Sequence, residues 1–230
     1  MLWNGHLGAL SLTFDDGLPC QIEHALPELD RAGLKGTFFL IKNSPYDTEF
    51  RRDVWKKAAA DGHEIGSHSV NHLKAATLSE PAAEEECRES RKFLEKELGI
   101  SVKSFAYPFT DVTKDLRSAV SRHYAQARGG RVAREDKFLR PGNGFDMLNV
   151  PCYHVGPHSI EAVPQWAQIA IERQSWVVLM FHGIGPDPSQ WDNVTTEQFR
   201  EMLEQLSEMQ ASGLWIDTFG AVAENLRKAQ

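Results

Sequence analysis

Short runs rich in β-branched and aromatic residues alternate with longer amphipathic stretches from one end of the chain to the other. This alternation is typical of βα units around a mostly parallel sheet. The apolar runs predict strands over residues 9–15, 36–41, 63–67, 103–107, 124–127, 148–154, 176–181 and 214–216. The amphipathic stretches predict helices over residues 21–32, 49–61, 80–98, 114–122, 160–174, 196–212 and 221–228.

Several predicted helices have recognisable ends. The segments 77–80 and 195–198 both fit the capping box, in which a hydroxyl and a carboxyl or amide satisfy each other's backbone donors. Gly33 and Gly213 stand where two helices should stop. Seven or eight strands, each followed by a helix, favour a closed or nearly closed (β/α) barrel, TIM-barrel-like, with an open sheet as the alternative. We expect one domain over residues 1–230, because no repeat or linker interrupts the pattern.

Composition and charge narrow the class of protein. The net charge of -7 is spread along the helices, so no patch favours nucleic acid or an anionic membrane. No apolar run approaches the roughly 20 residues of a membrane helix, and residues 1–8 lack a signal-peptide pattern. We therefore expect a soluble, cytoplasmic chain as it stands, although a removed export signal would leave no trace. Cys20, Cys87 and Cys152 have no paired spacing and predict neither disulfides nor a thiolate zinc site.

Three groups of titratable side chains follow predicted strands. Asp15 and Asp16 end the first strand, His68 and His72 follow the third, and His182 follows the strand over residues 176–181. Each has an ordinary interpretation by itself, as a turn, a pair of surface histidines or a histidine bonded to a carbonyl. Strand C-termini share one face of a barrel, however, so together they predict one site.

The residue types at this site suit a divalent metal. If the segment after Ser67 turns helical, His68 and His72 leave the same helix face and can bind one cation. Two neutral imidazoles and one carboxylate, here from Asp16, are a common set for a catalytic zinc with an open position for water. Such a metal lowers the pKa of its water, and Asp15 is available to take the proton.

At this point the chain resembles the polysaccharide deacetylases, or NodB-homology carbohydrate esterases, over most of its length. The resemblance rests on Thr13 to Gly17, His68 to His72, Phe105 to Phe109 and Leu179 to His182. It implies a distorted barrel, an acetylated saccharide as substrate, and one divalent metal: zinc, or else cobalt, nickel or manganese. It also implies roles for the residues: Asp15 as base, Asp16, His68 and His72 as metal ligands, and His182 as general acid.

The later motifs imply the walls of the substrate pocket. Tyr107, Pro108 and Phe109 are similar to a motif that forms one wall and offers a backbone N–H, here that of Phe109, to the oxyanion of the reaction. Leu179 corresponds to a residue that lines the acetyl pocket. Outside the motifs, we expect His154 and Trp191 to lie along the substrate groove.

The chain departs from the family pattern near the base. Well-known members have an arginine two residues before the proline of the third motif, where this chain has Ala106, and we find no copy of the fourth motif that braces it. Arg128, Arg131 and Arg140 are candidates to replace that arginine, although each is more simply interpreted as a surface or loop residue. What tunes the base Asp15 is therefore open at this stage.

Three functions fit these observations. The leading one is a metal-dependent hydrolase that removes acetyl groups from an N- or O-acetylated saccharide. The alternative keeps the same machinery but hydrolyses a small non-sugar amide, such as a cyclic imide or ureide. A catalytically silent carbohydrate-binding module is the third, which the matched acid and base argue against. The pattern does not indicate the oligomeric state.

Overall fold

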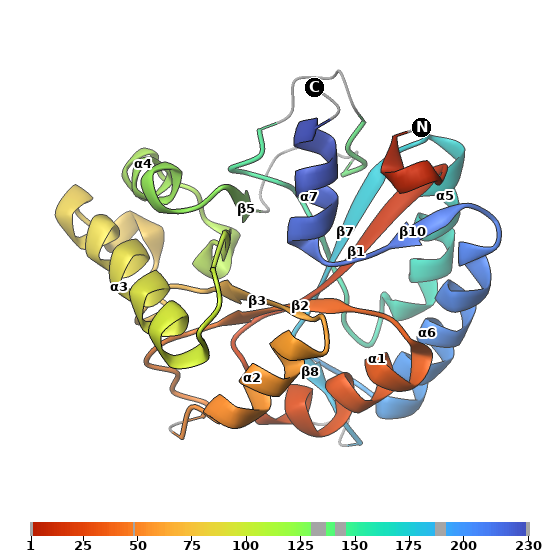
Figure 1. Ribbon diagram of the computed structural model, residues 1–230, viewed down its shortest axis with the longest axis horizontal. Coiled ribbons are helices and arrows are strands. Elements are labelled where there is room, and N and C mark those ends of the chain that lie inside the picture. The colour runs from red at the N-terminus through yellow and green to blue at the C-terminus, as the bar shows by residue number, and fades with distance from the viewer. Residues whose placement is uncertain (1, 48, 130–136, 141–145, 187–191, 229–230) are drawn as a thin grey trace.

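A computed structural model of the chain describes residues 2–47, 49–129, 137–140, 146–186 and 192–228. Parallel strands form one curved sheet in the order β5-β4-β3-β2-β1-β7-β6, and β10 pairs with the beginning of β1 (Figure 1). These strands are β1 (Gly8–Phe14), β2 (Gly36–Leu40), β3 (Glu64–Ser67), β4 (Ser104–Ala106), β5 (Gln126–Arg128), β6 (Tyr153–His154), β7 (Trp176–Phe181) and β10 (Leu214–Ile216). A separate short pair consists of β8 (Gly183–Ile184) and β9 (Asn193–Val194).

The two edges of the sheet are joined by one stretch of chain. The N–H of Val150 donates to Ala127 O at 2.9 Å, which pairs this stretch with β5. Four residues later, His154 pairs with Met180 of β7. Residues 150–154 therefore span the interval between β5 and β7, and the predicted (β/α) barrel class is confirmed.

Helices cover the outside of the curved sheet, with α3 and α4 at one side and α5 and α6 at the opposite side (Figure 1). The α-helices are α1 (Leu26–Ala32), α2 (Arg52–Ala60), α3 (Glu80–Leu98), α4 (Lys114–His123), α5 (Val163–Glu172), α6 (Thr196–Gln210) and α7 (Phe219–Lys228). A π-helical turn, η2 (Gln21–Ala25), precedes α1, and short 3-10 turns are η1 (Trp3–Gly5), η3 (Ala75–Thr77), η4 (Pro108–Thr110) and η5 (Ile160–Ala162).

Alternation along the strands separates two apolar layers. Leu10, Leu12 and Phe14 of β1 join the larger cluster, which lies between the sheet and the outer helices. Ala9 belongs to a second cluster on the concave face, together with Phe39 of β2. Helix α7 contributes four side chains to this inner cluster, Phe219, Val222, Ala223 and Leu226.

Buried polar groups fix the start of α7. The Phe219 N–H donates to Thr37 Oγ1 at 2.8 Å, and the Gly220 N–H donates to Glu64 Oε2 at 2.7 Å. Since the first N–H groups of a helix have no partner within it, these side chains act as its cap. The polar residues of β2 and β3 thus hold α7 against the concave face.

The predicted helix ends are partly right. Thr195 and Gln198 form the capping box of α6, and Gly33 ends α1 with a left-handed φ of 67°. The capping box predicted at residues 77–80 is wrong, because α3 starts at Glu80 with Ser79 as its N-cap and Thr77 lies in a 3-10 turn. All three cysteines are free, as their spacing predicts.

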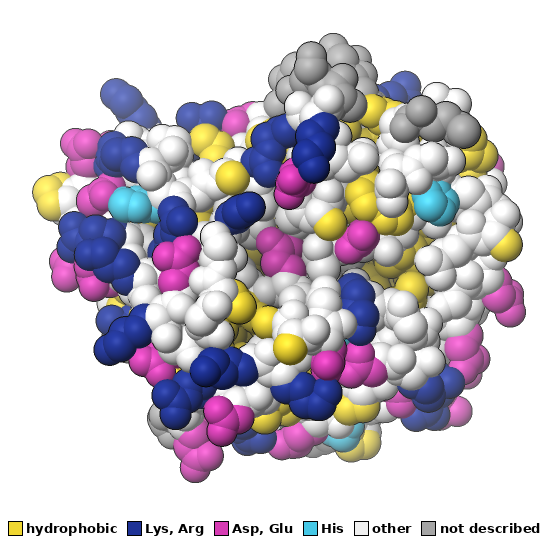
Figure 2. Space-filling model, viewed as in Figure 1, with side chains coloured by type: hydrophobic (Ala, Val, Ile, Leu, Met, Phe, Trp, Pro, Cys, Tyr) yellow, Lys and Arg dark blue, Asp and Glu magenta, His cyan; other side chains and the backbone are white. Residues whose placement is uncertain are grey.

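Charges on the surface are mixed by sign. Figure 2 shows dark-blue and magenta side chains interspersed on the face that carries α2, α3 and α4. Ion pairs link several of these residues, including Arg122 with Glu84 at 2.8 Å. Within the described ranges, every helix is too short or too polar to cross a bilayer.

Candidate active site

Asp15 and Asp16 lie in a turn directly after β1. Asp16 and Gly17 both have left-handed backbones, with φ of 74° and 64°. The carboxylates of Asp15 and Asp16 are both buried. The Gln21 side chain donates to Asp15 O at 2.6 Å and to His182 O at 3.0 Å. This buried amide therefore ties the end of β1 to the end of β7 and sets two of the predicted site residues side by side.

His68 and His72 converge on Asp16. Asp16 Oδ1 lies 3.5 Å from His68 Nε2 and 3.5 Å from His72 Nε2. The chain between the two histidines is not helical, contrary to our expectation, since Ser69 and His72 have left-handed φ values of 69° and 52°. The Ser69 hydroxyl accepts from the His72 N–H at 3.0 Å, and this tight turn brings the imidazoles together in place of a helix face.

These three side chains fit a divalent cation. Asp16 Oδ1 is buried and accepts no hydrogen bond from any described residue. Burial and the neighbouring Asp15 raise the pKa of Asp16 to about 6, a cost that a bound cation would relieve. Burial lowers the pKa of His68 to about 3 and also lowers that of His72, which favours the neutral form that a metal ligand needs. His68 Nδ1 donates to Ala106 O at 2.8 Å, which leaves Nε2 free to bind metal.

Arg128 forms an ion pair with Asp15. Its Nη2 donates to both carboxylate oxygens of Asp15, and both side chains are buried. The guanidinium lies over the Phe39 ring, 5.3 Å from its centroid, and Nη1 donates to Cys152 Sγ at 3.2 Å. Burial by itself would raise the pKa of Asp15, but the charges of Arg128, His68 and His182 together with the Arg128 hydrogen bond hold that pKa below its ordinary value.

The simpler interpretation of Arg128 as a surface or loop residue is therefore wrong. Strand β5 continues one residue beyond the predicted end, so Arg128 is its last residue and faces the barrel interior. It is the direct neighbour of Ala106 in the pairing of β4 with β5. Of the other two candidates, Arg140 is exposed and Arg131 lies outside the described residues.

His182 contacts a carboxylate that we did not predict, that of Asp192. Its Nδ1 is 2.9 Å from Asp192 Oδ2, and His154 Nε2 contacts the same oxygen. Burial favours the neutral ring, but the hydrogen bond to Asp192 and the charges of Asp15 and Asp16 raise the pKa of His182 above its usual value. A raised pKa suits a group that must carry a proton to give away.

Asp15, Asp16, His68, His72 and His182 all line one cavity of about 520 Å³. Exposed aromatic side chains, Tyr46 and Phe109, stand at this cavity, and the Phe109 ring lies 4.5 Å from that of His72. The described residues that line the cavity are Asp15, Asp16, Tyr46, His68, His72, Phe109, Thr110, His154, Met180 and His182.

Comparison with known families agrees with this geometry. Residues 5–127 match the family described as "Polysaccharide deacetylase". The chain belongs to the polysaccharide deacetylase family. The matched part contains Asp15, Asp16, His68 and His72, whereas Arg128 and His182 lie beyond it.

The alignments with known relatives cover less than half of each relative's length. A peptidoglycan-N-acetylglucosamine deacetylase of Bacillus cereus is 34% identical over 92 residues, which are 38% of this chain and 40% of that protein. A gellan lyase of a Bacillus species is 25% identical over 245 residues, which are 96% of this chain and 9% of that protein. The chain thus spans less than half the length of either relative.

Solved structures of the polysaccharide deacetylase fold cover nearly the whole chain. A putative polysaccharide deacetylase from Mycobacterium smegmatis aligns with a TM-score of 0.72 and 14% identity, over 98% of this chain and 92% of that one. The Xyl-CE4 domain of a multidomain xylanase from the hindgut metagenome of Trinervitermes trinervoides has a TM-score of 0.65 and 20% identity, over 96% and 91%. At these identities the likeness establishes the fold.

The structure places some of the predicted pocket residues elsewhere. Phe109 lines the cavity, but Tyr107 and Pro108 are buried behind it, and the Tyr107 hydroxyl donates to Leu148 O at 2.9 Å. Leu179 belongs to the outer apolar cluster, and its neighbour Met180 lines the cavity instead. Successive strand residues point to opposite faces, so Met180 shares the side of His182 and Leu179 does not.

Other expectations for the groove have mixed outcomes. His154 lines the cavity, as expected. Trp191 lies outside the described residues. Met180 and Asp192 were missed, although strand alternation counted back from His182 would have indicated Met180. Asp192 offers no comparable signal, because it comes from a loop whose course the sequence does not fix.

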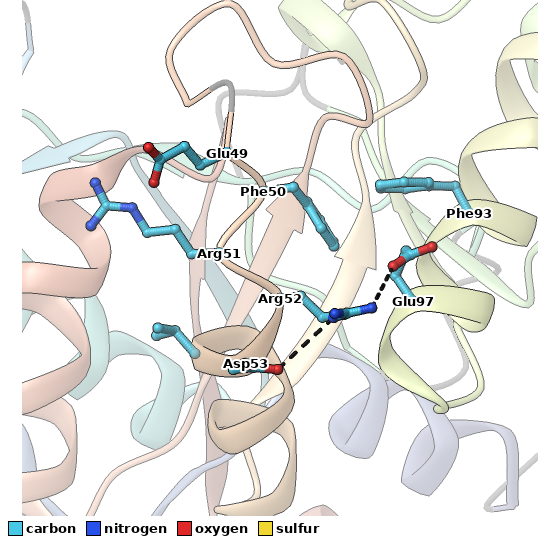
Figure 3. Close-up of a pocket in the computed structure, with 8 residues that line it drawn as sticks. Glu49, Phe50, Arg51, Arg52, Asp53, Phe93 and Glu97 are labelled. Carbon is cyan, nitrogen blue, oxygen red and sulfur yellow. Dashed lines mark hydrogen bonds and ion pairs between the residues drawn. The ribbon is translucent and has the colours of Figure 1, made fainter.

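A second hollow of about 600 Å³ lies between α2 and α3 (Figure 3). Its charged groups pair with one another, as in Arg52 Nη1 with Glu97 Oε2 at 3.3 Å. Phe50 and Phe93 line it and contact each other, with ring centroids 4.7 Å apart. Its eight described lining residues include neither histidine nor cysteine, so its chemistry does not match that of the cavity at the strand ends.

Proposed function

We propose that this chain removes an acetyl group from an N- or O-acetylated saccharide with the help of one divalent metal, zinc in the first instance. The observation that carries the proposal is the placement of a buried, charge-paired Asp15 beside the unpaired Asp16 Oδ1 and its two neutral imidazoles. A metal held by Asp16, His68 and His72 would act as a Lewis acid that activates water and polarises the acetyl carbonyl.

Asp15 is the base in this proposal. Its carboxylate is kept ionised by Arg128, and it lines the cavity next to the metal ligands. An ionised carboxylate can take the proton from the attacking water. Arg128 cannot compete for that proton, because a guanidinium stays charged at every working pH.

His182 and Phe109 handle the products of the attack. His182 contacts Asp192 through Nδ1. In this proposal its imidazolium form protonates the departing amine or alcohol. Phe109 has a left-handed φ of 56°, an uncommon conformation for an aromatic residue, and its N–H donates to no acceptor among the described residues. That N–H is available to the oxyanion that forms as the carbonyl is attacked.

Two exposed aromatic rings favour a saccharide over a small amide. Tyr46 and Phe109 are 53% and 48% exposed at the cavity, where burial in the free protein contributes little. Aromatic faces pack against the apolar face of a flat ligand, and a pyranose ring has such a face. A small cyclic amide would be bound better by an enclosed pocket than by two exposed aromatic rings at the cavity mouth.

The first test is acetate release by zinc- or cobalt-loaded protein from N-acetylated oligosaccharides and O-acetylated xylan, with ring opening of cyclic imides measured in parallel. We expect acetate from at least one saccharide. Asp15→Asn should keep its metal and lose turnover by on the order of 100-fold or more, whereas His72→Ala should lose metal. Imide opening without acetate, or full activity in Asp15→Asn, would overturn the proposal.

A further inference from the structure

One carboxylate oxygen joins two histidines at the acid side of the cavity. Asp192 Oδ2 lies 2.9 Å from His182 Nδ1, and it also accepts from His154 Nε2. The two rings are 5.5 Å apart between centroids and 65° apart in plane. A carboxylate has no proton to give at neutral pH, so both imidazoles direct an N–H at it.

The backbone and a glycine bring Asp192 to this position. Asp192 has a left-handed φ of 55°, which an aspartate tolerates better than most residues. A Cβ on Gly156 would lie 2.5 Å from Asp192 Oδ1, so only glycine allows this close approach. His154 is fixed by the pairing of β6 with β7, in which it lies beside Met180.

His154 has little packing role of its own. Its side chain is 48% exposed, whereas those of Asp192 and His182 are 10% and 13% exposed. Burial of so exposed a ring contributes little to stability. Its one described side-chain hydrogen bond goes to Asp192, and its carbonyl accepts from Ser159 at 3.3 Å.

We propose that His154 is a positioning residue for the proposed general acid: it holds Asp192 in place, and Asp192 in turn keeps one proton on His182 Nδ1. The proton that the imidazolium gives away is then the one on Nε2, and the neutral ring that remains is the Nδ1–H tautomer. This inference rests on the proposed role of His182. A carboxylate with a single donor can rotate away from it, and a second donor on the same oxygen prevents this. The partner of one imidazole nitrogen decides which tautomer is present, and so decides what Nε2 can do.

The same three side chains offer ligand atoms within 4.8 Å of one another, a spacing that a second cation would also accept. The hydrogen bonds favour the positioning role, because one oxygen serves both rings and each bond satisfies a buried or half-buried group. Metal content separates the two ideas. One equivalent of zinc per chain agrees with the positioning role, and a second equivalent that is lost in His154→Phe overturns it.

The experiment compares His154→Phe with His154→Gln, which keeps an N–H donor, and with the exposed His158→Phe as a matched control on the same loop. In metal-free, ¹⁵N-labelled protein, the ring nitrogens of His182 should show one tautomer in the wild type and in His154→Gln, and a mixture in His154→Phe. The loaded enzyme should lose kcat/KM on the order of 10-fold in His154→Phe, as for other outer-shell partners, and should keep it in His158→Phe.

Coupling through Asp192 gives an independent check. If His154 acts only by holding Asp192, the double variant His154→Phe with Asp192→Asn should be no less active than Asp192→Asn. Additive losses, or an unchanged His182 tautomer in His154→Phe, would refute the inference. Absence of acetate release from the wild type would instead refute the proposed function, and the ring spectra would still decide the role of His154.

Discussion

Arg128 and Asp15 are 113 residues apart in the chain and form a buried ion pair across the interior of the barrel. The pair answers the question raised by Ala106, which stands where family members have an arginine. Arg128 is the register neighbour of Ala106 on the adjacent strand, and the small Ala106 side chain leaves the interior to it. Asp15, the proposed base, is therefore paired with an arginine from β5 instead of one from β4.

Arg128→Met should lower both the rate of acetate release and the free energy of unfolding. It leaves the Asp15 charge buried without a partner, which costs about 3–5 kcal/mol of unfolding free energy. The pKa of Asp15 should rise, so the residual activity should appear only at higher pH, where the carboxylate is ionised again. Urea denaturation and the pH profile of acetate release check both effects. Arg140→Met, at an exposed position, is the control and should change neither.

A matched pair of variants tests which residue of β7 lines the cavity. Leu179→Ala should lower the unfolding free energy by about 2–5 kcal/mol, because Leu179 is fully buried in the outer cluster. Met180→Ala should change KM for the acetylated substrate with a smaller loss of stability, since Met180 borders the cavity. A KM effect in Leu179→Ala and none in Met180→Ala would restore the original expectation.

Gly156→Ala should damage the acid side without affecting metal binding. Its new Cβ would collide with Asp192 Oδ1, and the carboxylate would have to leave His182. We expect kcat/KM to fall on the order of 10-fold while zinc content stays at the wild-type level. Loss of zinc in this variant would mean that the two sides of the cavity are not separable.

The ion pairs of Glu28 should make the free energy of unfolding depend on pH in the acid range. Two hydrogen bonds from Arg200, at 2.7 and 3.1 Å, join α1 to α6, and Glu28 accepts a third from Arg31 within α1. Chiefly the Arg200 bonds lower the pKa of Glu28 to about 2. Since this pKa lies below the unfolded value of 4.5, the stabilisation is present above 4.5 and is lost as the pH falls towards 2.

Glu28→Gln tests this ion pair by urea denaturation across that range. The variant should be about 1–2 kcal/mol less stable at neutral pH and should lose less stability on acidification. Glu204→Gln removes a solvent-exposed partner of Arg31 and should cost about 0.5 kcal/mol or less. Equal acid profiles for Glu28→Gln and the wild type would assign the acid sensitivity to other groups.

The local patterns of the chain predicted most of the strands and part of the site. The strand expected over residues 148–154 is wrong for most of its length, since β6 covers only Tyr153–His154, and β8 and β9 were not predicted. Residues 176–181 and 214–216 form strands at the expected positions, because buried β-branched runs carry their own signal. Asp15, Asp16, His68, His72 and His182 were found because each follows such a strand. The helix expected after Ser67 did not form, and a tight turn brings the same side chains together.

What the sequence could not predict depends on closure of the barrel. Arg128 was set aside as an ordinary arginine because its partner, Asp15, lies across the interior and becomes visible only once β5 and β1 share one barrel. Asp192 reaches His182 through a left-handed backbone and the close approach to Gly156. Neither is a feature of local propensity, since both depend on contacts between distant segments.

The order of the proposed site residues along the chain separates two tasks. The proposed base and metal ligands all precede residue 73, whereas Arg128, the proposed general acid and its two supporting side chains all follow residue 127. In the proposed mechanism, metal binding and protonation of the leaving group therefore depend on separate segments of the chain. Substitutions after residue 127 can reshape the leaving-group side of the cavity while the three proposed metal ligands stay the same.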